Sequence, residues 1–466
     1  MDAAACSPRG LMVLSSRLVV HLPNVSPGPE WVPVRCASKE AYGCGELGER
    51  ILYGLNLLVR RVGYPNLNSS LSMDLSYGAL HCIQEDLGVP DYLQGLDGDM
   101  PRVEVMVQIA KAQVLVILLS FRLDNFEKRS YHLVYDATDA SLYMIPYISS
   151  DLETTYTLVP VPARPAGGGG RGHELALAAR KFWLQPGGAE RGRLCVCTPA
   201  TRAAAAASPA APDDGGIGAG PWETKVHGCS QKLPQLFRVD VMFSSGDKVF
   251  WADLSQGVAY SDLRQGGSVV DVVFVKLPDG CQIDLRSLPK NVQIDPMNMS
   301  RTMGCVHGSI KFVCIDRGVT PPGNKIVKAW TLDLDRQEWK EDEGFTCPWE
   351  ELWTKMCAMN ASRLKDVPIL EPQYPVLMPD GALCFLMPRA RHKWGTSVKR
   401  PDYICSFDML NKSCMCFGYV RNHHIIRPVV LPSDFFKGCN PAPLKKKPPT
   451  RKRKLPVRSI EEKGAS

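Results

Sequence analysis

Apolar residues alternate with other residues in short runs along much of the chain, and several of these runs end at an aspartate. In KVFWADLSQGVAYSDL, residues 248–263, one run ends at Asp253 and the next begins at Val258. A period of two predicts a strand with one buried face. Aspartate favours a turn because its carboxylate accepts hydrogen bonds from backbone N–H groups two or three residues on. The stretch therefore predicts a β-hairpin.

Three other stretches show the same pattern. They are YHLVYDATDASLYMI with Asp136, VKAWTLDLDRQEW with Asp333, and YICSFDMLNKSCMC with Asp408. In these three the aspartate precedes the next apolar anchor by six positions, whereas Asp253 precedes Val258 by five. Units that recur in this way predict a repeat array, because a single hairpin cannot bury its own apolar face. The alternative is coincidence, since turns favour aspartate in any large β protein.

A glycine turn followed by an alternating strand recurs as well, in VHGSIKFVCID (306–316) and PDGALCFLM (379–387), and SSGDKVFWADL joins such a turn directly to the Asp253 hairpin. Propeller blades contain four strands in about 40–50 residues. The predicted fold is mostly β, antiparallel and propeller-like, with about five to seven blade-sized units. The spacing is uneven: 80 residues separate Asp253 from Asp333, and 75 separate Asp333 from Asp408.

Few helices are predicted. TCPWEELWTKM, residues 346–356, has Thr346 as a candidate N-cap and Pro348 in the first turn. One apolar face of this helix contains Trp349, Leu352, Trp353 and Met356. ELGERILYGLNLLVRR, residues 46–61, is the second helical candidate.

Composition divides the chain into four parts. Residues 1–160 are an N-terminal β-rich part of the propeller-like body, and residues 223–440 are a second β domain. Between them, residues 161–222 carry Gly/Ala/Pro-rich insertions around a β-hairpin, because such stretches cannot build a core. Residues 441–466 are a basic tail that we expect to be disordered.

The positive charge of the chain lies in this tail. The formal net charge is +7, and residues 441–466 contain nine Lys or Arg and two Glu, which gives 9 − 2 = +7. The rest of the chain is neutral, which argues against a nucleic-acid-binding face on the body. Two basic clusters separated by PPT predict a nuclear-targeting segment that binds an import receptor, with phosphate contacts as an alternative. The residues are Lys445, Lys446, Lys447, Arg451, Lys452, Arg453 and Lys454.

The remaining composition is that of a globular protein, with 45% hydrophobic and 22% charged residues. The longest clean apolar run, VLVILL at 114–119, is far shorter than the ~20 residues that span a membrane, so we expect a soluble protein. No signal peptide is visible. The 17 cysteines are scattered, which predicts free, mostly buried thiols in a reducing compartment.

No pattern predicts a catalytic residue, a cofactor or a metal. GCGELG, residues 43–48, matches a dinucleotide-binding motif, but a polar stretch precedes it where a strand is required. Cys414, Cys416, His423 and His424 resemble a metal cluster, but no Cys-x-x-Cys pair accompanies them. On a regular strand Cys414 and Cys416 point to the same face, which suits core packing equally well.

Several segments between about Val239 and Val430, taken in their order along the chain, resemble the plant domain-of-unknown-function 1618 family, which is expanded in grasses. The most specific piece is the Phe-Trp-x-Asp-Leu-x-x-Gly core, which contains Phe250, Trp251, Asp253, Leu254 and Gly257. The resemblance implies a β-rich body similar to the kelch-like domains that follow F-boxes in plants. It implies no reaction, substrate or cofactor, and we interpret the five core residues as structural. No F-box is recognisable near the N-terminus.

The sequence therefore predicts a non-enzymatic protein-interaction module in the nucleus, the cytoplasm or both, with an unknown protein partner and no membrane association. The alternatives are a nucleic-acid-associated regulator that uses the basic tail, and a substrate-recognition subunit related to F-box-associated domains. An enzyme with a pocket built from distant loops is a third class.

Overall fold

The computed structural model describes most of the chain up to residue 436. The described residues are 11–23, 27–61, 66–88, 101–111, 113–122, 129–147, 159–162, 175–184, 190–198, 201–204, 221–228, 233–234, 237–263, 267–284, 297–316, 324–365, 367–388, 402–420 and 429–436. The basic clusters of the tail and the pair His423 and His424 lie outside them.

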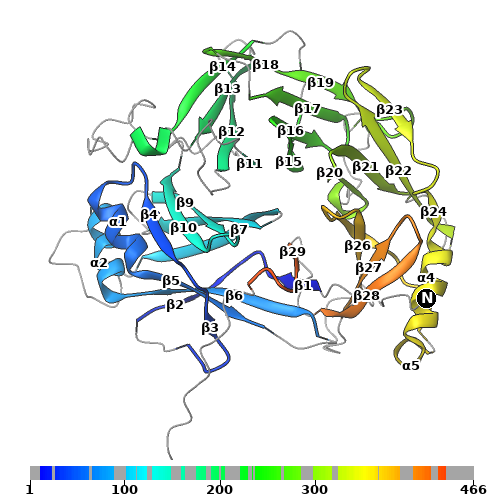
Figure 1. The fold of residues 1–466 in the computed structure, drawn as a ribbon, viewed down its shortest axis with the longest axis horizontal. Helices are drawn as coiled ribbons and strands as arrows, with labels where there is room; N and C mark the ends of the chain where they lie inside the picture. Colours follow the sequence, from blue (N-terminus) through cyan, green and yellow to red (C-terminus); the bar gives the residue numbers. More distant parts are fainter. Residues whose placement is uncertain are drawn as a thin grey trace, which may run out of the picture.

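Five antiparallel blades are arranged as a β-propeller (Figure 1), as the alternating pattern predicts. Blade 1 contains β7 (Arg102–Lys111), β8 (Val114–Arg122), β9 (Arg129–Asp136) and β10 (Ser141–Pro146), with β4 (Ser38–Ala41) parallel to β10. Blade 2 contains β11 (Val159–Pro162), β12 (Leu175–Leu184), β13 (Glu190–Cys197) and β14 (Glu223–Gly228), with β18 (Val269–Asp271) parallel to β14.

The other three blades follow in chain order. Blade 3 contains β15 (Val241–Ser245), β16 (Lys248–Asp253), β17 (Gly257–Asp262) and β19 (Val273–Lys276). Blade 4 contains β20 (Arg301–Val306), β21 (Ser309–Ile315), β22 (Ile326–Asp333) and β23 (Glu338–Glu341), and β24 (Cys347–Pro348) also pairs with β22. Blade 5 contains β25 (Gln373–Leu377), β26 (Ala382–Met387), β27 (Asp402–Asp408) and β28 (Ser413–Val420).

A sixth, mixed sheet, which we call the closing sheet, lies between blade 5 and blade 1 (Figure 1). Its strands are β29 (Val429–Pro432), β1 (Leu11–Leu14), β6 (Asn68–Leu75), β5 (Leu55–Arg60) and β3 (Val32–Pro33), in that order, and β2 (Val19–His21) pairs with β6. β1 is antiparallel to β29 and parallel to β6. Strands from the two ends of the described chain thus share one sheet.

Six apolar cores close the ring, one between each pair of neighbouring sheets. The core between the closing sheet and blade 1 contains Leu57 and Ile117, and the core between blades 1 and 2 contains Val116 and Cys195. The next two contain Val196 with Trp251, and Phe250 with Phe312. The last two contain Val313 with Phe385, and Cys384 with Val13 of β1. Because strands bury both faces, each sheet depends on the sheets at either side.

The helices lie in connections outside the sheets. α4 (Trp349–Met359) is followed by α5 (Ala361–Leu364), and a short 3₁₀ helix, η2 (Met297–Met299), precedes β20. The predicted face of α4 is buried, but the predicted N-cap at Thr346 is wrong, because β24 extends to Pro348 and the helix begins afterwards. The second helical candidate is correct only in its first half: α1 (Gly45–Tyr53) ends there and β5 follows. α2 (Tyr77–Asp86) was not predicted.

The aspartate turns form as expected, but they are not equivalent. Asp136, Asp333 and Asp408 each follow the third strand of a blade, whereas Asp253 follows the second. Successive antiparallel strands run in opposite directions, so a turn after the second strand and a turn after the third lie at opposite ends of a blade. Asp253 pairs with Gly257, which leaves three residues in its turn, whereas each of the other three turns contains four.

Cys414 and Cys416 do not share a face. A β-bulge shifts the register between Ser406 and Phe407, so that Cys416 pairs with Ser406 but Cys414 pairs with Phe407. Cys414 therefore packs between blades 4 and 5, and Cys416 packs toward the closing sheet. Cys195 and Cys197 do share one core. No helix in the described part of the chain is long and apolar enough to cross a membrane.

Candidate interaction site around the Asp253 turn

The turn between β16 and β17 is built from residues of the Phe-Trp-x-Asp-Leu-x-x-Gly core. Phe250 and Trp251 are both fully buried, and they face opposite ways along β16. Phe250 packs against blade 4 and Trp251 against blade 2. Leu254 joins the same core as Phe250. The motif thus connects three blades through one strand.

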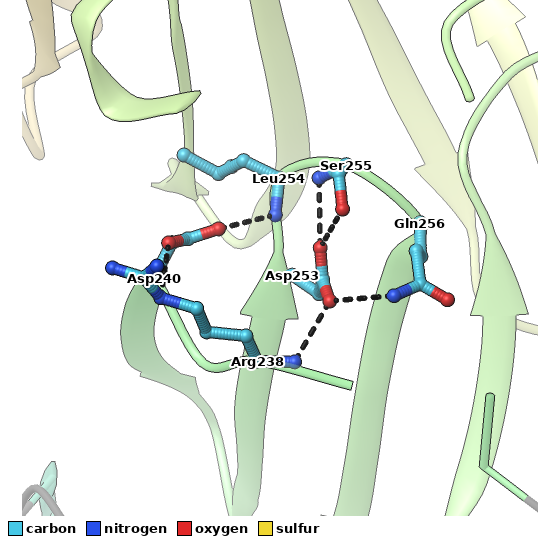
Figure 2. Close-up of polar contacts among 6 residues, drawn as sticks. All are labelled: Arg238, Asp240, Asp253, Leu254, Ser255 and Gln256. Atoms are coloured by element: carbon cyan, nitrogen blue, oxygen red, sulfur yellow. Dashed lines mark hydrogen bonds and ion pairs between the residues drawn. The ribbon is translucent and has the colours of Figure 1, made fainter. Parts of the chain in front are cut away.

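Asp253 is 1% exposed, and its carboxylate accepts four hydrogen bonds (Figure 2). Oδ1 accepts from the backbone N–H and the hydroxyl of Ser255, at 2.8 and 2.5 Å. Oδ2 accepts from the backbone N–H of Arg238 at 2.8 Å and from Nε2 of Gln256 at 3.1 Å. A buried carboxylate is stable only with such a set of donors. These contacts place Asp253 in a structural role, because its oxygens are already occupied by donors.

A second carboxylate holds the other side of the turn. Asp240 accepts the backbone N–H of Leu254 at 3.0 Å and lies 3.7 Å from Nε of Arg238 (Figure 2). The side chain of Arg238 is 82% exposed. The guanidinium of Arg238 is therefore presented to solvent beside a rigid turn.

Blade 4 also contacts the Asp253 turn through hydrogen bonds. Nη1 of Arg301, in β20, donates to the carbonyls of Leu254 at 2.8 Å and of Cys281 at 2.6 Å. The backbone N–H of Ile283 donates to the carbonyl of Ser255 at 2.8 Å. Arg301 is 8% exposed and lies over the ring of Phe312. Backbone groups far apart in the sequence are thus held in one arrangement.

Gly257 allows β17 to pass close to β19. A Cβ atom at Gly257 would lie 2.4 Å from the carbonyl oxygen of Val275 and 2.5 Å from the ring of Phe274. No side chain fits at that distance, so the glycine is required by close backbone approach rather than by its φ angle.

Two buried cysteines of blade 5 have raised pKa values. Burial raises the pKa of Cys384 and of Cys414 to about 12, which keeps these thiols protonated and poorly nucleophilic. Within the described ranges, no group of three or more His, Cys, Asp or Glu side chains is arranged to hold a metal ion. What the described site does present is a rigid edge with exposed charged groups.

The Asp253 turn lies on the face of the propeller where second strands end and third strands begin, which we call the connection face; in blades 4 and 5 its connections are long. Second strands end here: β21 ends at residue 315 and β22 begins at 326, and β26 ends at 387 and β27 begins at 402. On the opposite face the first and second strands of blades 1, 3, 4 and 5 meet in tight turns, whereas in blade 2 β11 ends at 162 and β12 begins at 175. Two of these turns touch, since the hydroxyl of Ser245 lies 3.4 Å from the carbonyl of Gly308.

Sequence reasoning identified the turn but missed several of its partners. Arg238, Asp240, Cys281 and Arg301 carry no local signal, because they reach the turn only through the packing of blades 3 and 4. The predicted nuclear-targeting residues, Lys445–Lys447 and Arg451–Lys454, lie outside the described residues.

Comparison with known proteins identifies a family for part of the chain. Residues 251–384 match the model of a family described as protein of unknown function, DUF1618. This match confirms the resemblance for that segment, which begins at Trp251 and ends in β26. No curated protein matches the chain.

Two solved structures show a distant similarity. One is NanB with Optactamide, with 8% identity over 68% of this chain and a TM-score of 0.27; this chain spans 40% of its length. The other is an apocarotenoid oxygenase mutant from Synechocystis, with 9% identity, coverage of 86% of this chain and 92% of the other, and a TM-score of 0.27.

Proposed function

We propose that this chain is a non-enzymatic protein-interaction module whose connection face binds a protein partner. The observation that supports this proposal is that both carboxylate oxygens of Asp253 accept hydrogen bonds from donors within the protein. The carboxylate and its donors stabilise the turn, and they leave exposed side chains such as Arg238 on a preorganised surface. Preorganised surfaces bind with less loss of conformational freedom than mobile ones.

The test compares the two faces in the full chain. Arg238→Glu combined with Asp279→Lys changes exposed charges on the connection face, and Arg336→Glu combined with Lys412→Glu changes exposed or half-exposed charges on the opposite face. Proximity labelling in cells should lose its reproducible protein partners for the first double variant and keep them for the second. Equal labelling by the wild type and both variants would contradict the proposal.

The basic tail is proposed to act as a nuclear address. Its charge, nine Lys or Arg against two Glu in residues 441–466, supports this role. Deletion of residues 441–466 should abolish nuclear accumulation and leave retention on DNA or RNA unchanged. Loss of nucleic-acid retention would instead favour the second candidate, a regulator that uses the tail for phosphate contacts.

The finer part of the family resemblance is a proposal as well. A plant origin and a relation to kelch-like domains would suit a substrate-recognition subunit, a form of the same interaction role. Copurification with components of a ubiquitin ligase would support that form, and their consistent absence from the labelled partners would count against it.

A further inference from the structure

The helix pair α1 and α2 carries two exposed aromatic side chains, one at the end of α1 and one at the start of α2. Tyr53 ends α1 and is 67% exposed, and Tyr77 begins α2 and is 66% exposed. Gly54, which follows Tyr53, and Ser76, which precedes Tyr77, are hydrogen-bonded: the backbone N–H of Ser76 donates to the carbonyl of Gly54 at 2.9 Å. The pair lies at the outer side of the ring (Figure 1).

The fold does not need these tyrosines for its core. α1 buries Ile51 and Leu52, and α2 buries Ala79, Leu80 and Ile83, all in the core between the closing sheet and blade 1. Tyrosine is among the residues enriched where proteins bind partners, since its ring supplies a large contact area and its hydroxyl tolerates water.

The same surface is acidic. Glu46 and Glu49 of α1 and Glu85 of α2 are exposed. Arg50 lies 3.7 Å from Glu85, so the four side chains carry a formal charge of −3 + 1 = −2. The ammonium of Lys39 lies at the end of α1, where it donates to the carbonyls of Leu52 and Tyr53 and to Oδ1 of Asn56, so with Lys39 included the formal charge is −3 + 2 = −1. Acidic residues around tyrosine rings are complementary to lysine and arginine.

The described chain ends near this surface. Phe435 and Phe436 pack on the ring of Tyr135, and Arg61 donates to the carbonyl of Phe436. On the same face of β9, the hydroxyl of Tyr131 donates to Asp86, the last residue of α2, at 2.6 Å. Tyr135 follows Tyr131 by four positions on the strand, a rise of about 13 Å. Phe436 and the end of α2 therefore contact the same face of one strand.

The length of the following segment is sufficient to reach the tyrosines. Lys445 follows Phe436 by nine positions, with eight residues between them. An extended chain of that length spans at most about 30 Å. A ten-residue helix such as α2 is only about 15 Å long.

We propose that the chain's own basic segment, Lys445–Lys454, docks on the outer face of α1 and α2. Lysine and arginine side chains lie over the rings of Tyr53 and Tyr77 and pair with Glu46, Glu49 and Glu85. Docking would cover the residues proposed as the nuclear address. This consequence rests on the proposed nuclear-targeting role of the tail, whereas the docking itself does not.

The experiment uses the full chain and a carbodiimide, which joins a lysine to a carboxylate that it contacts. Mass spectrometry should find crosslinks from Lys445–Lys447 or from Lys452 or Lys454 to Glu46, Glu49 or Glu85 in the monomer. The yield should fall about tenfold in 0.5 M salt, because exposed ion pairs are screened. The double variant Tyr53→Ser, Tyr77→Ser should reduce the yield to the same level.

The matched control is a second acidic surface on the outer strand of blade 4, where Glu338, Glu341 and Glu343 are exposed. Replacing these three with glutamine should leave the crosslinks to α1 and α2 unchanged. Crosslinks mainly to residues 338–343, crosslinks only in dimers, or no tail crosslinks at all would each overturn the proposal. Nuclear accumulation is scored separately, so the loss of nuclear targeting and the loss of docking are distinguishable.

Discussion

At the scale of the residue, Asp253 is the clearest determinant of local structure, because one buried carboxylate receives donors from Arg238, Ser255 and Gln256. Asp253→Asn keeps the shape of the side chain but replaces one acceptor oxygen with an amide donor. We expect the free energy of unfolding to fall by about 3 kcal/mol, because buried donors lose their partner. Urea unfolding followed by circular dichroism measures it.

The matched control is Asp333→Asn, at an exposed turn with two backbone donors. This change should lower the free energy of unfolding by less than about 1 kcal/mol. Equal losses at the two positions would show that the buried network adds nothing beyond an ordinary aspartate turn.

His132 makes stability depend on pH. Its ring is 0% exposed, and burial lowers its pKa from 6.5 to about 3. Between pH 6.5 and pH 3 the unfolded chain binds a proton that the folded chain does not, so stability falls as the pH falls. His132→Phe, which retains the stacked ring beside Tyr147, should remove a slope of about 1.4 kcal/mol per pH unit. Urea unfolding at pH 7, 6 and 5 measures the slope, and parallel curves for the two proteins would contradict the assignment.

At the scale of the element, three turns share one conformation. The loops after Asp136, Asp333 and Asp408 each contain four residues, and the last one has a positive φ. These last residues are Ala140 (φ 60°), Gln337 (φ 57°) and Lys412 (φ 50°). A side chain is strained in this left-handed region, whereas glycine is not.

Gln337→Gly should therefore stabilise the protein by about 0.5–1 kcal/mol, after the added freedom of glycine in the unfolded chain is subtracted. Gln337→Ala is the control, since it shortens the side chain but keeps the strain. Thermal unfolding of both variants decides the point, and a stabilisation by alanine as large as that by glycine would exclude the strain.

Elements were predictable from the sequence where the signal is local. The alternation before each aspartate and the apolar face of α4 are such signals, and both are confirmed. Features that depend on the pairing of strands were not predictable from the sequence. The bulge that separates Cys414 from Cys416 arises from the register with β27, and the end of α1 depends on the pairing of β5 with β6.

At the scale of the whole molecule, stability depends on ring closure by β1 and β29. Leu431, 1% exposed, belongs to the core between the closing sheet and blade 1. Leu431→Ala should lower the free energy of unfolding by about 3 kcal/mol. Hydrogen exchange should accelerate in β1 as well as in β29, since Leu431 pairs with Met12. Acceleration confined to β29 would show that the closure is only local.

The sequence predicted the number of blades only as a range, and the reason lies in the closing sheet. Its strands come from residues 11–75 and 429–432, so no single window of the sequence contains the unit. Its β1–β6 pairing is also parallel, which a hairpin repeat does not indicate. The Asp253 turn was predictable because its core residues are contiguous in the sequence. Its contact with Arg301 was not predictable, because Arg301 lies in another blade.

The pairing of β1 with β29 has a consequence for how the protein is made. A ribosome produces β1 before every other described strand and β29 after all of them, so β1 has no β29 beside it until the other described strands have been made. During that interval Val13, fully buried in the finished molecule, has no cover from β29 or blade 5, and uncovered apolar surface of this kind favours aggregation of a nascent chain.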